Sequence, residues 1–446
     1  MRPSRPVCRP FAPDQQRDWL SSRGLFDWSE QITDEPVAEC DPESVAHVRR
    51  LLRAAGKTDH ASMPDDRLLD DLRLAESGHL SRAGVLLVGS EAQIARAVPT
   101  YGYAFQHRPT PGQEALFRLR QALPILVAVE QLMAAVEARS AMIPLNLAGG
   151  AQLTLEQFPK AAVRELIVNA FVHRSYETNG SVEVEHSPEA LTLTSPGGLV
   201  SGVSPENILT HPSTPRNRLL METVAMLGIA ERTGQGIDRV YRELLRVGKA
   251  PVTFDDSGTL VRASIEGARG DESFARFVAS LDAAWQADIE VLLVLRALCA
   301  RPTVTATRIA PLIQRSAVDA ERLLRRLADD DRPLLAPTKK SSYRLRPEHR
   351  AALGRAVSYR TEAGEFDEKV ADHLEEFGVI TNRTLQRMFD ISVFAARDLL
   401  RDLQNRGVVV KSSEAQSGPG VQYGRGPNLT AARGKRRNRS GRRETT

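Results

Sequence analysis

The sequence predicts a multidomain α+β protein. Between Leu155 and about Ala268, expected helices alternate with segments of alternating apolar and polar residues, which is typical of a mixed sheet with helices on one face. The last third contains an internal repeat, because residues 305–338 align with residues 381–413. Each copy predicts a short helix, a turn, a longer amphipathic helix and a strand, the order found in a winged helix-turn-helix. With 446 residues, the chain is long enough for roughly three domains.

The composition is that of a soluble globular protein, with 41% hydrophobic and 26% charged residues. The longest apolar runs, such as 291–298, are short and contain charge, whereas a membrane span needs about 20 apolar residues. No apolar run follows the basic N-terminus, so no secretory signal is expected. The three cysteines (Cys8, Cys40 and Cys299) match neither a disulfide framework nor zinc spacing. We therefore expect a cytoplasmic protein.

The positive charge is concentrated in the last residues. From Ala431 onward there are seven arginines and lysines and one glutamate, a net charge of +6, whereas the whole chain carries +4. A segment without apolar residues cannot fold alone, so we expect a disordered basic tail over 429–446. Arg436 and Arg437 are candidates for contact with a polyanion such as DNA. The alternative is a merely solubilising terminus.

The first 150 residues predict an irregular segment over 1–40, rich in proline and arginine, and then an α/β domain of unassigned role over 41–150. Asp41 is an expected N-cap with Pro42 at the first helical position. The further elements expected in this domain are a helix over 64–77, a strand over 84–90, another strand over 100–108 and a long helix from Gln113 to about Arg139.

One short motif in this region resembles the end of a phosphate-binding loop. Gly56, Lys57 and Thr58 would complete that loop only if residue 51 were glycine, and it is leucine. No predicted strand precedes it either. The helicase type of nucleotide motor is therefore not expected.

The helix expected after residue 158 contains Glu165 and Asn169, four residues apart among apolar neighbours. Residues at i and i+4 lie on one helical face, with their Cβ atoms about 6 Å apart. A carboxylate beside an amide can orient a water molecule and hold a cation. In isolation the pair is more commonly a polar stripe on a packed helix, because short motifs recur freely.

The segments that follow this helix predict a hairpin, two glycine-rich turns and a closing strand. The hairpin strands are expected over 180–187 and 190–195, and the first glycine-rich loop over 195–202. A helix over 214–229 precedes a second glycine-rich turn, Gly234 to Gly236, which opens another helix. Glycine turns at a helix N-terminus present N–H groups to anions.

Four motifs in this block, taken together, resemble a known family. They are "FPKAAVRELIVNAFVHRSY", "TSPGGL", "PRNRLL" and "ERTGQGI", between Phe158 and Phe254. As a set they resemble the C-terminal ATPase-like domain of RecG-related transcriptional regulators, a divergent member of the GHKL superfamily of gyrase, histidine kinases and MutL. The resemblance implies a GHKL-like α/β sandwich that binds ATP and Mg²⁺, over 151–270.

The resemblance also implies roles for individual residues. Asn169 would coordinate Mg²⁺ that bridges the ATP phosphates, and Glu165 would polarise the attacking water. One amide ligand suffices, because Mg²⁺ keeps several waters and phosphate oxygens. The remaining nucleotide-contacting candidates are His173, Pro196, Gly197, Gly198, Gly234 and Gly236.

Two features depart from the family pattern. The adenine-reading Asp of a D-x-G-x-G box is replaced by Ser195, followed by Pro196, Gly197 and Gly198. Family members usually begin with a Schlafen-type AlbA nucleic-acid-binding domain, but here "RDWLSSRGLFDWSEQ" looks like the segment that follows it. That domain is therefore expected to be missing or truncated. A domain that keeps the fold and binds nothing is the alternative, because fold does not determine function.

The two repeats predict winged helices over 285–355 and 366–428. In the second, Arg397 and Arg401 lie on the exposed stripe of the expected recognition helix, and Lys411 and Arg425 flank the expected wing. In the first, the corresponding helix ends in "ADDD", which would repel phosphate. The second copy is therefore the better candidate for binding DNA.

These features predict a nucleotide-binding transcriptional regulator that binds double-stranded DNA. Any ATP hydrolysis would be weak, and a homodimer is compatible with this interpretation. The alternative is an ATPase component of a stress or phage-defence system, whose helix-turn-helix modules bind proteins.

Overall fold

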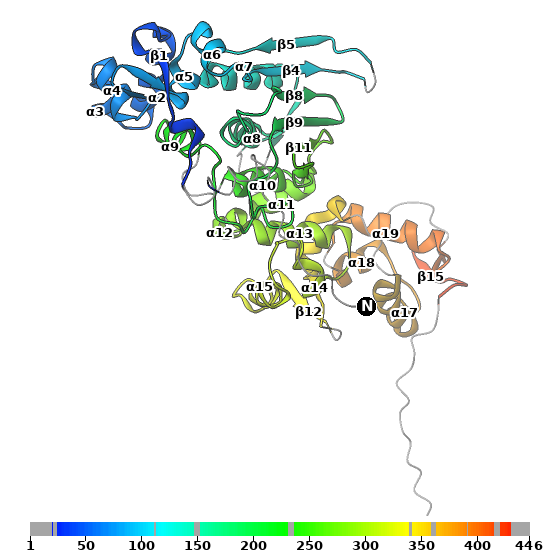
Figure 1. Cartoon of the computed structure of the whole chain (residues 1–446). Helices are drawn as coiled ribbons and strands as arrows, with labels where there is room; N and C mark the ends of the chain where they lie inside the picture. The colour runs from blue at the N-terminus through cyan, green and yellow to red at the C-terminus, as the bar shows by residue number, and fades with distance from the viewer. Residues whose placement is uncertain are drawn as a thin grey trace, which may run out of the picture. The chain divides into compact units, whose positions relative to one another are not determined.

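The chain forms two compact units (Figure 1). Unit 1 contains Met1–Cys299 and Thr303–Ala356, and unit 2 contains Ala300–Pro302 and Val357–Thr446. The computed structural model describes residues 20, 25–110, 113–146, 152–230, 236–338, 341–357, 363–389, 391–413 and 420–429. None of the helices in these ranges is long and apolar enough to cross a membrane.

A six-stranded mixed sheet forms the centre of unit 1. Its order is β10-β11-β9-β8-β4-β5, and every neighbouring pair is antiparallel except β4 and β8, which are parallel. The mixed sheet predicted from the alternating segments is therefore confirmed. The strands are β4 (Tyr103–His107), β5 (Phe117–Gln121), β8 (Val182–His186), β9 (Ala190–Pro196), β10 (Thr253–Asp256) and β11 (Leu260–Glu266).

This sheet takes strands from both sides of residue 150. β4 and β5 lie within 41–150, and the other four strands lie within 151–270. The expected boundary at residue 150 therefore does not divide the structure at this sheet. The sequence could not reveal this, because β4 and β8 pair over a separation of 79 residues. Tyr103, for example, lies opposite Val182.

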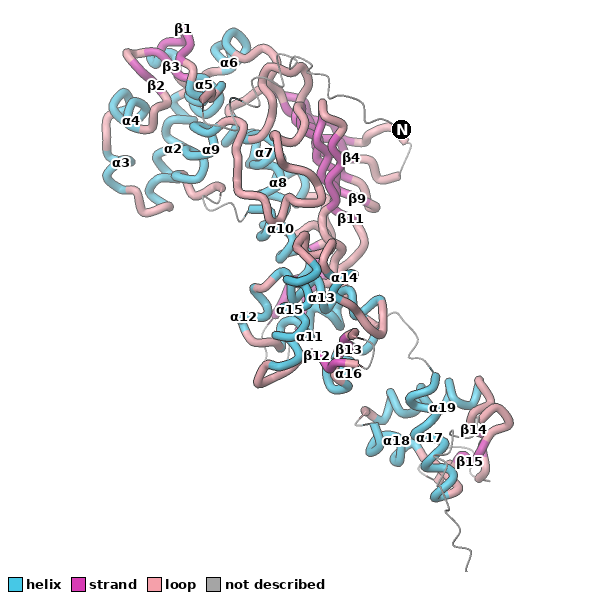
Figure 2. The backbone as a smooth tube through the Cα atoms, turned by 60° about the horizontal axis from the view of Figure 1, so that its bottom comes forward, coloured by secondary structure: helices cyan, strands magenta, loops and turns pink. Residues whose placement is uncertain are grey.

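The helices α7 (Ile125–Glu137), α8 (Lys160–Val172) and α10 (Gly236–Arg246) lie together along one face of the sheet (Figure 2). Strand alternation explains why: in β8, Val182, Val184 and His186 are buried, whereas Glu183 and Glu185 are exposed. Helix α8 packs between α7, α10 and β9 and has apolar neighbours on almost every side. The core of unit 1 thus surrounds the helix that carries Glu165 and Asn169.

The N-terminal part of unit 1 is a smaller α+β layer that begins before residue 41. A three-stranded sheet of order β1-β3-β2 packs with short helices, and α9 contacts it through η1. The elements are η1 (Trp28–Glu30), β1 (Ile32–Pro36), η2 (Val37–Glu39), α2 (Pro42–Ala54), α3 (Thr58–Ser62), α4 (Asp65–Asp71), β2 (Ala75–Glu76), β3 (His79–Ser81), α5 (Arg82–Val88), α6 (Glu91–Ala97) and α9 (Arg218–Met226). The prediction of an irregular segment over 1–40 is therefore wrong for residues 28–39.

The sequence prediction was wrong for three further elements in this region. Residues 82–88 form α5 and not a strand, because Ser81 caps the helix and an apolar run buried on all sides has no diagnostic periodicity. The helix predicted over 64–77 ends at Asp71, because Arg73 has a left-handed φ of 56°. The long helix predicted from Gln113 is strand β5 followed by α7, which begins after Pro124.

Asp41 caps α2 as predicted, since its carboxylate accepts the Ser44 N–H at 3.0 Å. The expected strand over 100–108 and the hairpin of β8 and β9 are also present. The remaining elements of unit 1 before the repeats are β6 (Met142–Asn146), β7 (Gln152–Glu156), α11 (Glu272–Ser280) and α12 (Ala283–Ala287).

Two modules in the last third have the same order of elements. Each has three helices and an antiparallel two-stranded hairpin, and each adds an isolated bridge at the same place, Val304 with Tyr343 and Ile380 with Tyr423. Module I (289–345) contains α13 (Ile289–Ala300), α14 (Ala306–Ile309), α15 (Ala317–Asp329), β12 (Leu335–Pro337) and β13 (Tyr343–Leu345), and α16 (Pro347–Leu353) and η4 (Gly354–Ala356) follow it. Module II (363–425) contains α17 (Ala363–Phe377), α18 (Asn382–Phe389), α19 (Val393–Asn405), β14 (Val409–Lys411) and β15 (Tyr423–Arg425).

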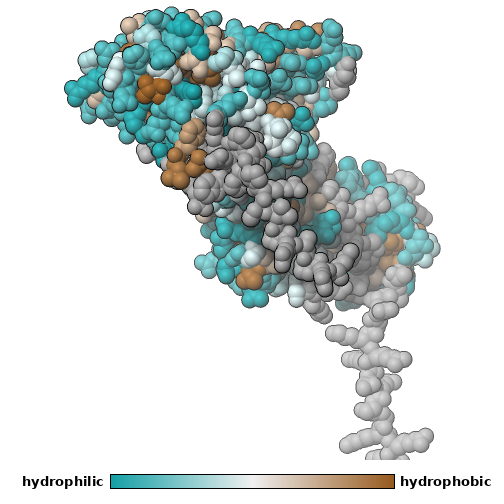
Figure 3. Space-filling model, in the orientation of Figure 1, coloured by the Kyte–Doolittle hydropathy of each residue, from teal (hydrophilic) through white to brown (hydrophobic). Residues whose placement is uncertain are grey.

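The face of the molecule drawn in Figure 3 is mainly hydrophilic, with small separate hydrophobic patches. Scattered exposed apolar side chains are usual for folded proteins and do not by themselves mark an interface. The site therefore has to be sought in the cavities of the fold.

Candidate functional site

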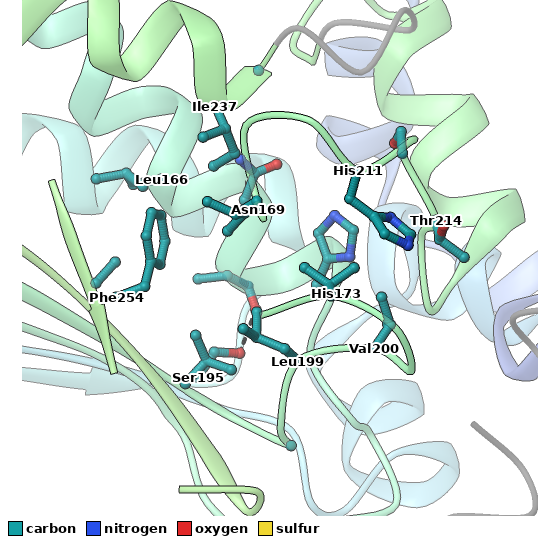
Figure 4. Close-up of a pocket in the computed structure, with 18 of the residues that line it drawn as sticks. Leu166, Asn169, His173, Ser195, Leu199, Val200, His211, Thr214, Ile237 and Phe254 are labelled. Carbon is teal, nitrogen blue, oxygen red and sulfur yellow. Dashed lines mark hydrogen bonds between the residues drawn. The ribbon is translucent and has the colours of Figure 1, made fainter. Parts of the chain in front are cut away.

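A cavity of about 160 Å³ lies between α8, the end of β9, the start of α10 and strands β10 and β11. Apolar side chains form most of its lining, among them Leu166 and Phe254, with a few polar groups from α8 and from the segment 197–214 (Figure 4). A concave, mostly apolar site with few converging polar groups is the usual form of a small-molecule site.

Three predicted residues reach this cavity from successive turns of α8. Glu165, Asn169 and His173 are spaced by four residues, and all three line the cavity. The predicted i, i+4 pair therefore faces a cavity and not a solvated stripe. Asn169 and His173 are labelled in Figure 4, where both side chains lie on the cavity side of the helix.

Glu165 lies beneath the first residue of α10. Glu165 is buried, with only 3% of the residue exposed. A Cβ atom at Gly236 would lie 2.2 Å from Glu165 Oε1, so that any larger residue at this position requires the end of the Glu165 side chain to move. A carboxylate beside a helix N-terminus is also electrostatically favourable. Two residues predicted separately, Glu165 and Gly236, are thus in direct contact.

His173 ends α8 as its C-cap residue. Burial, with a smaller contribution from the Arg216 guanidinium, lowers the pKa of His173 to about 4. The imidazole is therefore neutral at pH 7, and it offers hydrogen bonds to a ligand and no positive charge.

The C-terminal carbonyl groups of α8 are bound by side chains from a motif whose role sequence reasoning missed. Asn217 Nδ2 donates to the carbonyl oxygens of Val172 and Arg174 at 2.8 and 2.9 Å. Arg216 Nε donates to His173 O at 3.0 Å, and its NH2 group donates to Gly198 O at 2.7 Å. These two residues join the end of α8 to the glycine turn. The "PRN" motif was visible in the sequence, but its capping role was not.

Glycine is required in the turn after β9 because other segments of the chain pass close to its backbone. Gly197 has φ +96°, and a Cβ there would lie 2.7 Å from Ser175 Cβ. A Cβ at Gly198 would lie 2.7 Å from the carbonyl oxygen of Gly258. Both glycines line the cavity, whereas Pro196 is buried at the end of β9 and is not part of the lining.

Ser195 lies near the end of β9 and lines the cavity. Its hydroxyl donates to Ala170 O at 2.7 Å and ties β9 to α8 (Figure 4). The hydroxyl oxygen keeps acceptor capacity toward the cavity. Around it the wall is apolar, from Ala170, Leu193 and Ala263.

Several lining residues had no signal in the sequence. His211 and Thr214 enter the cavity from the loop before α9, Met221 from α9, Ile237 from α10 and Phe254 from β10. No spacing rule links them, because only the tertiary fold brings these segments together. Gly234, the other candidate in the second glycine-rich turn, lies outside the described residues.

The predicted DNA-contacting residues lie in unit 2. Arg397 and Arg401 are exposed, one turn apart on α19, and Arg397 lies over the Phe394 ring at 5.7 Å. Lys411 lies on β14 and Arg425 on β15, which pair in the hairpin. Arg436 and Arg437 lie outside the described residues. The structure thus groups these four residues in module II.

Comparison with known proteins identifies one part of the chain. Residues 179–265 match a family model described as putative ATP-dependent DNA helicase recG C-terminal. This segment includes the glycine turn and the start of α10, whereas α8 precedes it. No curated protein matches the chain.

A solved structure shares the fold over most of the chain. The crystal structure of the DIP2311 protein from Corynebacterium diphtheriae is similar with a TM-score of 0.64 and 23% sequence identity, over 78% of this chain and 70% of that one. At this identity the likeness concerns the fold alone. The chain therefore contains an ATPase-like domain related to the RecG C-terminal family model.

Proposed function

We propose that the cavity binds ATP or a related purine nucleotide together with Mg²⁺. The observation that carries this proposal is the convergence of Asn169, His173, the glycine turn and the start of α10 on one mostly apolar cavity. The base would lie among Ala170, Leu193 and Ala263, beside the acceptor oxygen of Ser195. The phosphates would then point toward Asn169 and the N–H groups at the start of α10.

The donor set suits a magnesium ion shared with a ligand. Among the described residues, no three His, Cys, Asp or Glu side chains are grouped to hold a metal ion. Asn169 would supply the protein ligand, with phosphate oxygens and waters completing an octahedral shell. The ion would neutralise phosphate charge. Glu165 would orient a water molecule for weak hydrolysis, from its place beside Gly236.

Calorimetric titration with ATP, with and without Mg²⁺, tests this proposal. Asn169→Ala is expected to weaken Mg²⁺-dependent binding at least about tenfold, because it removes the metal's protein ligand and a charged-group contact is worth about 1.5–3 kcal/mol. Asn405→Ala, an exposed asparagine at the end of α19, serves as the matched control and is expected to bind like the wild type. Absence of heat with any adenine or guanine nucleotide would refute the proposal.

We further propose that both modules are winged helices and that module II binds double-stranded DNA in a transcriptional regulator. The support is the difference between their third helices. In module I, the arginines on or next to α15 form ion pairs with nearby carboxylates. The pairs are Arg315 with Glu290, Arg322 with Asp319, Arg325 with Glu321, Arg326 with Asp288 and Arg332 with Asp282. In module II, Arg397 approaches its neighbour Asp398 at 3.6 Å, whereas Arg401 is exposed and forms no ion pair with a described residue.

DNA titration separates base contacts from phosphate contacts. Arg397→Ala and Arg401→Ala are expected to reduce preference for a selected site, because a bidentate arginine–guanine contact is worth about 1–3 kcal/mol. Lys411→Ala and Arg425→Ala should weaken binding to all duplexes alike. Deletion of 431–446 should flatten the dependence of log K on log salt.

One observation favours the second candidate function, a protein-docking module. Val393 and Phe394, at the start of α19, are 51% and 66% exposed. If all four arginine and lysine variants bind selected and random DNA like the parent, module II docks a protein, and the chain is an ATPase component of a larger system.

A further inference from the structure

Gln314 lies in the turn between α14 and α15 of module I and adopts a left-handed backbone conformation, with φ 53°. Turns between the two helices of a helix-turn-helix often contain glycine, which reaches positive φ without a Cβ clash. Glutamine is disfavoured in this conformation. An outlier of this kind points to a side chain that is needed where it stands.

The Gln314 side chain holds the backbone of a segment that walls the nucleotide cavity. Its Nε2 donates to Pro205 O at 2.8 Å, and its Oε1 accepts the Leu209 N–H at 2.7 Å. We call residues 203–214 the wall loop, because Val203, Ile208, His211 and the residues from Pro212 to Thr214 line the cavity. The two hydrogen bonds of Gln314 bracket Ile208.

The wall loop borders a second cavity as well as the first. Leu209 and Thr210 face a second, polar cavity of about 290 Å³. Its other lining residues include Asp238 and Arg242 from α10 and Glu290 and Arg315 from module I. Since packed interiors resist displacement and open cavities do not, the position of this wall depends on its hydrogen bonds. Asn207 ties the loop to itself through Ser204 N–H and Gly202 O, and Gln314 ties it to module I.

Helix α10 also borders both cavities. Gly236 and Ile237 line the nucleotide cavity, and Asp238 and Arg242 line the polar cavity. A ligand that draws α10 and the wall loop inward therefore changes the spacing between both elements and module I. Gln314 is hydrogen-bonded to the wall loop and lies two residues before Ser316, which caps α15.

We propose that Gln314 is a positioning residue of the nucleotide cavity, supplied by module I, and that it couples ligand binding to the helix-turn-helix turn. This inference rests on the proposed nucleotide binding. Linkage makes the coupling reciprocal: if module I stabilises the closed wall for the ligand, the ligand stabilises module I to the same extent.

The first measurement is hydrogen exchange of the unaltered full-length protein, with and without ATP and Mg²⁺. The nucleotide is expected to slow exchange in α8 and also in residues 305–316 of module I. Slower exchange in α8 without any change in 305–316 would overturn the coupling and leave nucleotide binding intact. No change in either segment, with no calorimetric heat, would instead refute the proposed function itself.

The second measurement is the nucleotide affinity of Gln314→Gly. Glycine accepts the left-handed turn, and this relief offsets part of the stability that is lost with the two hydrogen bonds to the wall loop. Affinity for ATP with Mg²⁺ is expected to drop about tenfold, within the range typical of coupling between sites. The nucleotide effect on exchange in 305–316 should disappear while that in α8 remains.

Ser341→Gly is the matched control, because Ser341 has a similar φ of 48° in the same module and is exposed. It should relieve the same backbone conformation without changing nucleotide affinity. Equal affinities of the wild type, Gln314→Gly and Ser341→Gly would overturn the positioning role.

Discussion

Glu165 and Gly236 show what a sequence motif can and cannot reveal about a residue. The spacing of Glu165 and Asn169 predicts a shared helical face, and α8 confirms it because helical geometry is local. The contact of Glu165 with Gly236 joins positions 71 residues apart, and no local rule contains it. The hydrogen bond from the Ser195 hydroxyl to Ala170 O, which ties β9 to α8, had no signal in the sequence either.

Gly236→Ala tests this contact directly. The added methyl group would meet Glu165 Oε1 and displace either the carboxylate or the start of α10. Overpacking of this kind typically lowers stability by about 1–3 kcal/mol. Denaturant unfolding of Gly236→Ala, Glu165→Ala and the double variant measures the interaction. We expect the double variant to be more stable than the two single effects predict, whereas strict additivity would contradict the contact.

Two histidines make the stability of unit 1 depend on pH. Burial is the main cause that lowers the pKa of His173 and of His186 to about 4, and His107, with its Nδ1 atom 3.1 Å from His186 Nδ1, lowers the pKa of His186 further. The unfolded chain therefore takes up these protons first as the pH falls from about 6.5, the usual histidine pKa. Stability should be full above that pH and fall between about 6.5 and 4.

Thermal melting at pH 7 and pH 5 measures this loss. A pKa difference of one unit corresponds to about 1.4 kcal/mol. His186→Leu, at a site lined by Phe105 and Phe158, should make the melting temperature less sensitive to pH. His79→Leu on β3, an exposed position, is the control and should keep the wild-type sensitivity. An unchanged pH dependence in His186→Leu would contradict this explanation.

Helix α9 illustrates how an element takes its caps from distant residues. Its N-cap residue Asn217 makes no capping bond, because its amide binds the end of α8. Instead, the Leu219 N–H donates to Asp27 Oδ2 at 2.7 Å, and the Leu220 N–H donates to Ser29 Oγ at 3.2 Å. Trp28, between these two residues, stacks on Tyr176 with ring centroids 4.7 Å apart. The segment 27–29 thus joins the N-terminal layer to α9 and to the chain just after α8.

Asp27→Ala should therefore destabilise α9 although Asp27 is 192 residues away from Leu219. Loss of an N-cap costs about 0.5–2 kcal/mol, and burial of the freed N–H groups places the expected loss toward the upper end. Because α9 carries Met221 of the cavity lining, nucleotide affinity should also fall. Melting and calorimetry of Asp27→Ala are compared with Asp34→Ala, an exposed position on β1. Equal behaviour of the two variants would show that the distant cap is unimportant.

The elements that sequence reasoning predicted well are those with a clear period. Strands β8 and β9 alternate, and α15 and α19 have a distinct apolar face, so their existence and type were predictable. Helix α5 was missed because Ala83 to Val88 are all buried, which removes the polar positions that reveal a period. Strand β5 was missed because its residues were included in the long helix predicted from Gln113, and because β5 is defined by its pairing with β4.

At the scale of the whole molecule, the two repeats differ in how the arginines of their third helices are paired. Module I has ion-paired arginines and holds the wall loop of the cavity through Gln314. In module II, Arg397 and Arg406 pair with Asp398 and Asp402, but Arg401 has no ion pair with any residue that the structure describes, and the basic tail follows the module in sequence. This distribution is the basis for assigning the coupling role to module I and the DNA-binding role to module II. Net charge could be counted from the sequence, but the pairing of each arginine could not.

Photo-crosslinking with 8-azido-ATP is the most direct measurement of the central claim, because it reports both binding and location. With Mg²⁺ present, the label is expected on peptides that contain residues 193–200 or 254–263, where the base would lie. Excess ATP should prevent the labelling, and Asn169→Ala should reduce it. Labelling that ATP does not suppress, or that occurs on other peptides only, would contradict a nucleotide site in this cavity.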